Sequence, residues 1–220
     1  NRQGIRTWTT RKILTLTKPQ QMYMFYLDLD DFKKVNDTYG HQVGDQLLIK
    51  FSHHIQKFLD SMNAITYAFS RLSGDQFALV ILGLKPQDLN NFSINLLSLL
   101  DTPILLEDHQ TQVRVSLGIS KLEKEVKTFE NLLARADSAM YYAKKDGKNC
   151  YKIFNESVSQ DLFFRKQTAE QIKNAIIQDD FHLNFMPIFD ANTLDMVSVE
   201  VLLRTNLSSL EGIGPEVFIP

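Results

Sequence analysis

The sequence lacks the features that mark secreted, membrane-spanning or nucleic-acid-binding proteins. A single cysteine, Cys150, excludes a disulfide within the chain and suits a reducing cytosol. No apolar run reaches the ~18 residues of a membrane span, and no signal-peptide pattern is present. With 24 Lys and Arg against 26 Asp and Glu, the formal net charge is −2, which favours neither nucleic acid nor an anionic membrane surface. We therefore expect a cytoplasmic region with no nucleic-acid partner, and membrane contact only through segments absent here.

What the chain does contain is enough apolar material for a packed core. Hydrophobic residues make up 44% of the 220 positions and charged residues 23%, which is ordinary for one large or two small globular domains. There is no internal repeat or low-complexity tract. The chain begins at Asn1 and ends at Pro220 in mid-pattern, so we expect it to be a piece of a longer protein.

The stretch MYMFYLDLDDFKKVNDTYGHQVGD, residues 22–45, organises the chain. Its first residues are almost all apolar or aromatic, which is typical of a strand buried on both faces. This strand runs into the carboxylates of Asp28, Asp30 and Asp31, whose burial costs solvation free energy that a bound cation can offset. Lysines and turn-forming residues follow. The pattern indicates a site for a metal-bound polyphosphate, although a bare D-x-D on its own is more often a solvated surface loop.

This run closely resembles the first signature of the GGDEF family, the diguanylate cyclases of bacterial signalling. The family's second signature, G-G-[D/E]-E-F, belongs on a hairpin some tens of residues downstream. That place is occupied by Ser73-Gly74-Asp75-Gln76-Phe77. Ser73 replaces the first glycine and Gln76 replaces the glutamate, so the motif is degenerate. The resemblance covers about residues 20 to 155.

Apolar periodicity predicts an α+β fold. After a polar segment, in which Pro19 ends any helix, the expected elements alternate. They are a strand from residue 22, a short helical turn, a helix over 46–59, strands over 64–72 and 76–82, a helix over 86–100, a strand over 113–119, a helix over 129–143 and a strand over 151–154. These elements predict a central, mostly antiparallel sheet covered by helices. The resemblance implies the palm-like (ferredoxin-like) fold of nucleotide cyclases, with Asp28 and Asp75 at one edge.

The resemblance also implies a metal site. Its protein ligands for Mg²⁺ or Mn²⁺ are Asp28, the backbone carbonyl of Leu29, and Asp75, and Asp75 helps to deprotonate the attacking hydroxyl. Read without the resemblance, Asp75 is an ordinary hairpin-turn residue.

The expected substrate is GTP. Lys33 matches the lysine that contacts the phosphates and the transition state, while the backbone near Asp31 and Phe32 would hold the triphosphate. Asn36 and Asp45 match the pair that reads guanine. A solvated helix lysine is the alternative for Lys33, and helix capping is a role that Asp45 could also have.

Three further positions match the family's substrate site. His41 lies in the matching G-H motif, and a plain turn residue is its alternative. Lys144 and Lys148 match two distal phosphate contacts, although helix C-termini favour lysines in any case. At the position of Lys148 the family usually has Arg, whose guanidinium can bind a phosphate through two N–H groups. Lysine offers a single point charge instead.

The departures from the family pattern bear on activity. A β-carbon at Ser73 crowds backbone that passes close to the nucleotide. Gln76 removes a negative charge beside the metals, and an amide cannot act as a base. The product-inhibition motif R-x-x-D is also absent, because residues 64–67 read Ala-Ile-Thr-Tyr.

From residue 156 the residue pattern changes. Residues 156–180 form an expected linking helix between a GGDEF domain at 21–155, preceded by the segment 1–20, and a second domain that starts at 181. The run FHLNFMPIFDANTLDMVSVEVLLRT resembles the opening of an EAL domain, a cyclic di-GMP phosphodiesterase. Glu200 matches a metal ligand there and Arg204 a phosphate contact. The family's later ligands lie beyond residue 220, so no phosphodiesterase activity is expected from this fragment.

Two functions remain open at this point. The first is a diguanylate cyclase, a nucleotidyltransferase that joins two GTP into cyclic di-GMP plus pyrophosphate. Its activity would need a homodimer, because each copy holds one GTP, and would be impaired by the SGDQF motif. The second is a catalytically inactive GTP-binding domain that regulates the adjoining EAL phosphodiesterase.

Overall fold

The structure, a computed structural model, describes residues 1–16, 21–62, 65–99, 103–106, 109–123 and 126–205. The chain divides into two units, residues 1–158 and 159–220. Each unit is described by itself.

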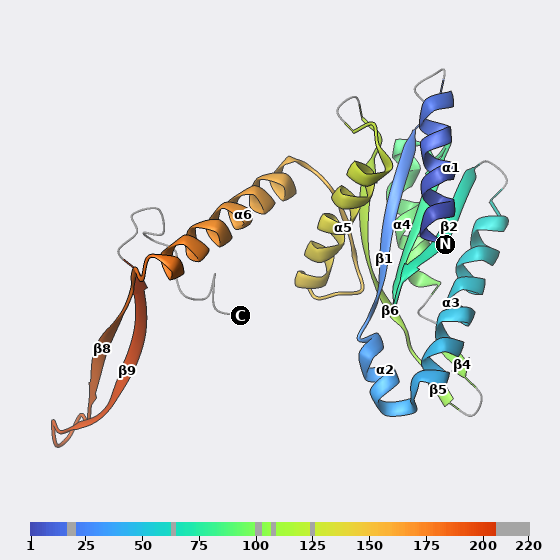
Figure 1. Ribbon diagram of the computed structural model, residues 1–220. Coiled ribbons are helices and arrows are strands. Elements are labelled where there is room, and N and C mark those ends of the chain that lie inside the picture. Colours follow the sequence, from blue (N-terminus) through green and yellow to red (C-terminus); the bar gives the residue numbers. More distant parts are fainter. Residues whose placement is uncertain (17–20, 63–64, 100–102, 107–108, 124–125, 206–220) are drawn as a thin grey trace. The chain divides into compact units, whose positions relative to one another are not determined.

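The first unit is built on a five-stranded sheet in the order β2-β3-β1-β6-β7 (Figure 1). Its strands are β1 (Met22–Asp30), β2 (Thr66–Ser73), β3 (Gln76–Leu82), β6 (Arg114–Lys121) and β7 (Tyr151–Ile153). All neighbouring strands are antiparallel except β6 and β7, which are parallel. The expected mostly antiparallel sheet is confirmed, and β1 lies at its centre.

Helices cover both faces of this sheet. One face carries α1 (Arg2–Thr15) and α5 (Phe129–Lys145), and the other carries α3 (His41–Asp60) and α4 (Leu89–Ser98). The smaller elements are α2 (Phe32–Tyr39), the 3₁₀ turn η1 (Pro86–Asp88) and the hairpin of β4 (Ile104–Leu106) and β5 (His109–Thr111).

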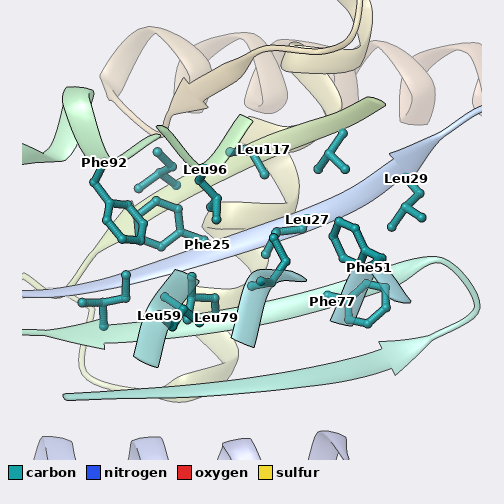
Figure 2. Close-up of a cluster of buried hydrophobic side chains, with 14 of the residues drawn as sticks. Phe25, Leu27, Leu29, Phe51, Leu59, Phe77, Leu79, Phe92, Leu96 and Leu117 are labelled. Atoms are coloured by element: carbon teal, nitrogen blue, oxygen red, sulfur yellow. The ribbon is translucent and has the colours of Figure 1, made fainter. Parts of the chain in front are cut away.

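The alternation of side chains along β1 sorts its residues between the two layers. Phe25, Leu27 and Leu29 belong to the cluster shared with α3 and α4, shown in Figure 2. Met24 and Tyr26 belong to the cluster shared with α1 and α5. Because β1 is buried on both faces, its nearly unbroken apolar sequence is explained.

Close packing of α5 on β6 depends on Gly118. A β-carbon at this position would lie 1.9 Å from the carbonyl oxygen of Ala136 and 2.2 Å from the amide nitrogen of Met140. Both are backbone atoms, so only glycine lets the helix approach this strand.

Several elements differ from the sequence-based expectation. The polar segment contains the helix α1, which is capped by Asn1, whose Oδ1 accepts from the Gly4 amide at 2.8 Å. The turn after Asp31 is a complete helix, α2, and α3 begins at His41 instead of Gln46. The β4–β5 hairpin was not expected. These elements bury few side chains in a clear stripe, so periodicity could not reveal them.

The second unit contains a hairpin of β8 (Phe181–Phe189) and β9 (Met196–Thr205), which pair antiparallel. It is preceded by α6 (Glu156–Ile177), which spans the division between the units. Both faces of the hairpin expose large apolar side chains, since successive strand residues point to opposite faces. The exposed set includes Leu183, Phe185, Met186, Ile188, Phe189, Met196, Val197, Val199 and Val201.

Within the part of the chain that the structure describes, no helix combines the length and the apolar character that crossing a bilayer requires.

Candidate nucleotide and metal site

The end of β1 and the tip of the β2–β3 hairpin meet at one point. The strand register sets Asp28 opposite Gln76. One residue further on, the Leu29 amide donates to the carbonyl oxygen of Asp75 at 3.3 Å. The two segments that carry the sequence signatures are therefore joined by backbone contacts, and Asp28, Leu29 and Asp75 lie together.

Asp28 is the buried acid where β1 meets the β2–β3 hairpin. It is only 3% exposed. The Lys144 ammonium lies 2.5 Å from Oδ1, and the Gln76 amide donates to Oδ2 at 3.5 Å. Burial raises the pKa of the Asp28 carboxyl and the charge of Asp75 adds to this, while Lys144 and Gln76 oppose it.

The neighbouring acids have different partners. Asp30 accepts from the Ser116 hydroxyl at 2.8 Å and from the Asn149 amide at 3.0 Å, so it ties β1 to β6 and to the loop after α5. Asp31 has a left-handed backbone, with φ at 58°, and its carboxylate pairs with Lys148 at 3.0 Å. Lys148, with help from Lys34, lowers the pKa of the Asp31 carboxyl.

Two lysines at the end of α5 pair with these acids, and a third lysine lies in α2. Lys144 comes from the last turn of α5 and pairs with Asp28, while Lys148 follows that helix and pairs with Asp31. Lys33, in the first turn of α2, is exposed and makes no ion pair with any residue that the structure describes. Its charge is available to an anion.

A polar corner forms where α2 meets α3. The Asn36 side-chain oxygen is buried there without a hydrogen-bond partner among the described residues. A β-carbon on Gly44 would lie 1.9 Å from that oxygen and 3.2 Å from the Phe32 ring. Glycine therefore leaves room for the Asn36 amide. Asp45, the next residue along α3, and His41 are exposed.

The hairpin motif has one anchored end and one polar end. Phe77 is fully buried and its ring centroid lies 4.9 Å from that of Phe51. At the tip, the Gly74 carbonyl accepts from the Arg71 Nε at 2.6 Å. The Ser73 hydroxyl donates to the Gln76 side-chain oxygen at 3.1 Å.

Comparison of the sequence with known protein families agrees with this geometry. The family model described as "Diguanylate cyclase, GGDEF domain" matches residues 1–150. The chain belongs to the GGDEF family.

Relatives agree with this assignment of the GGDEF domain. The biofilm architecture maintenance protein MbaA of Vibrio cholerae is 34% identical over 208 residues, which cover 91% of this chain and 26% of MbaA. The bifunctional diguanylate cyclase/cyclic di-GMP phosphodiesterase MucR of Pseudomonas aeruginosa is 32% identical over 197 residues, which cover 90% of this chain and 28% of MucR. The chain thus spans about a quarter of the length of these relatives.

A solved structure supports the fold. The GGDEF domain of TpbB (YfiN) from Pseudomonas aeruginosa superposes with a TM-score of 0.67 at 25% identity, covering 74% of this chain and 94% of that one. The palm-like α+β fold of the GGDEF domain is confirmed.

The GGDEF residues fit a hard divalent cation. Asp28 and Asp75 can supply carboxylates and Leu29 a backbone carbonyl, and oxygen donors of this kind suit Mg²⁺. Burial raises the pKa of the Asp28 carboxyl, and a bound cation would favour its ionised form. No group of three His, Cys, Asp or Glu side chains gathers in a metal-binding arrangement within the described ranges. A set of two carboxylates and a carbonyl does not need one.

The sequence did not reveal the residues that support this GGDEF site. Ser116 and Asn149 hold Asp30, and the bonds from Ser73 to Gln76 and from Gln76 to Asp28 connect the hairpin to β1. The contacts to Asp28 and Asp30 join segments that are far apart in the sequence, so no local pattern signals them. Of the absent product-inhibition motif, Ala64 lies outside the described residues and Tyr67 lies in β2.

Proposed function

We propose that this GGDEF domain binds GTP together with Mg²⁺ or Mn²⁺. Two copies facing each other then convert two GTP into cyclic di-GMP and pyrophosphate, at a rate lowered by Ser73 and Gln76. The observation that supports it most directly is the backbone hydrogen bond from Leu29 to Asp75, because it holds the hairpin tip that carries Asp75 against the end of β1 that carries Asp28.

Side chains on both sides of the C-terminal end of β1 support GTP binding. Lys33 is exposed and unpaired among the described residues, Lys144 pairs with Asp28, and Lys148 pairs with Asp31. These cations suit a triphosphate. The Asn36 side-chain oxygen, which has no hydrogen-bond partner among the described residues, can accept from a guanine N–H. The Asp45 carboxylate is the expected second contact to guanine, and His41 is a further expected substrate contact.

The reaction is an in-line displacement. The 3′-oxygen of one GTP attacks the α-phosphorus of the other, and the bond from that phosphorus to the departing pyrophosphate breaks. Asp75 accepts the proton of the attacking hydroxyl, and Lys33 and Lys144 hold the phosphate oxygens against the developing charge. A bound cation would neutralise charge on the reacting phosphate. Since each copy holds one GTP, the homodimer is required.

The second candidate is a GTP-binding domain that regulates an adjoining EAL domain without catalysing the cyclase reaction. The loss of cyclase activity is favoured by Gln76, whose amide occupies the position of an acid in the family motif. The adjoining phosphodiesterase domain is favoured by the likeness to MucR, whose name includes both activities. The exposed apolar faces of the β8–β9 hairpin also suit the opening strands of a larger domain. In that domain Glu200 and Arg204, both on β9, are the expected metal and phosphate contacts.

Two measurements test the proposal. Calorimetry with and without Mg²⁺ should show that the chain binds GTP more tightly than ATP. Asp28→Asn should make GTP binding independent of Mg²⁺. Incubation with GTP and Mg²⁺, followed by chromatography, should yield cyclic di-GMP. No heat with GTP rejects both functions, and binding without product leaves the regulatory one.

A further inference from the structure

Both oxygens of the Asp28 carboxylate lie against donors that belong to this chain. The Lys144 ammonium lies 2.5 Å from Oδ1, and the Gln76 amide lies 3.5 Å from Oδ2. The Ser73 hydroxyl in turn donates to the Gln76 side-chain oxygen at 3.1 Å. That bond turns the amide nitrogen of Gln76 towards Asp28.

The two departures from the family motif therefore act as one unit. Glycine in place of Ser73 has no hydroxyl to orient the amide. Glutamate in place of Gln76 has no N–H to donate when ionised. A neutral amide next to Asp28 can donate where a carboxylate would only repel, so Ser73 and Gln76 together suit an Asp28 carboxylate that holds no cation.

Lys144 supplies the charge that balances Asp28. The acid is almost completely buried, and one ammonium at ion-pair distance neutralises it. A divalent cation that used Asp28 would meet that ammonium at the same oxygen, and the two positive charges repel. Lys144 must therefore leave Asp28 before a cation can bind there.

The proposed GTP site provides the group that draws Lys144 away. Its side chain is 34% exposed and is flexible enough to turn towards a phosphate. Resting on that proposed function, we infer that the Lys144 ammonium exchanges between Asp28 and the nucleotide's phosphates, so that the nucleotide-free chain excludes divalent cations. Metal and GTP then bind cooperatively, because each favours the same position of Lys144.

The test measures Mn²⁺ alone, by electron paramagnetic resonance of the free ion, on the nucleotide-free chain. Lys144→Met should bind Mn²⁺ about tenfold more tightly than the original chain, which is about 1.4 kcal/mol. The matched control is Lys145→Met, because the neighbouring Lys145 ammonium lies over the Tyr141 ring and not at the acids. It should leave the Mn²⁺ affinity unchanged. Equal affinities of the original chain and Lys144→Met overturn the inference.

A second variant keeps the inference testable if Lys144→Met does not fold, which circular dichroism would show. Gln76→Met removes the donor to Oδ2 without adding charge, and we expect Mn²⁺ to bind about threefold more tightly, or about 0.7 kcal/mol. Unchanged affinity in this folded variant counts against the inference. If the Mn²⁺ differences appear but GTP does not bind, the exclusion of cations stands and the proposed function fails.

Discussion

Replacing Gln76 with glutamate separates the two proposed functions. The new carboxylate would stand where the amide nitrogen now lies, 3.5 Å from Asp28 Oδ2. Two unit charges about 4 Å apart repel by about 4 kcal/mol at an effective dielectric of 20. Lys144 offsets part of this, and a bound cation would offset more.

The repulsion gives a signature without substrate. Burial already raises the pKa of the Asp28 carboxyl, and a second acid beside it, introduced by Gln76→Glu, raises that pKa further. A carboxyl whose folded pKa exceeds its unfolded value favours folding below the unfolded pKa, and this stability is lost as the pH rises through the folded pKa. Thermal melts of Gln76→Glu should therefore show greater stability at lower pH, with a steeper dependence on pH than the original chain has.

The effect on catalysis should be larger than the effect on binding. The loss of one preorganised group that stabilises developing charge in a transition state costs about 2.7 kcal/mol, which is about 100-fold in rate, and we take this as the scale for Gln76. We expect Gln76→Glu to raise cyclic di-GMP turnover by about this factor, with Ser73→Gly adding to it. GTP affinity should change less, because the gain belongs to the transition state.

The uncharged Gln76→Met is the control and should give no gain in turnover. The reasoning is refuted if the variant with both Ser73→Gly and Gln76→Glu binds GTP at concentrations where it dimerises and still makes no product. The regulatory function would then be the one that remains.

Three further outcomes are expected. Gly118→Ala should lower the free energy of unfolding by about 3 kcal/mol in denaturant titrations, because its β-carbon meets backbone. Cyclic di-GMP should leave the NMR signals of Tyr67 unshifted, since its hydroxyl is held by Asp60 and burial, with that carboxylate, raises its pKa to about 12. The pKa of the Asp31 carboxyl should lie below its ordinary value of 3.8, and Lys148→Met should raise it in an NMR titration. The stabilisation from this pair is present above the unfolded pKa and lost as the pH falls through the folded one.

The sheet was predictable because its strands have strong, simple patterns. The apolar run of β1 and the apolar β3 place the two central strands, and the family signatures place Asp28 and Asp75 at their junction. The helix α1 was not predictable, because it buries only Ile5 and Thr9. A stripe of two residues cannot be told from a polar segment.

The relations between site residues were beyond the sequence for a different reason. Three acids within four positions look alike, yet Asp28 is paired with Lys144, Asp30 with Ser116 and Asp31 with Lys148. These partners lie on distant segments, and only the folded register brings each one to its acid. Such tertiary contacts cannot be predicted from the local periodicity of the sequence.

The β8–β9 hairpin affects how any assembly of this chain should be measured. Its apolar side chains lie on both faces of two strands, so copies of the chain can associate through this hairpin at high concentration. A dimer seen by light scattering could then come from the hairpin and have no relation to facing GTP sites. A chain limited to residues 1–158, the unit with its own sheet and core, separates the two sources of self-association. Association that persists without the hairpin belongs to the GGDEF domain.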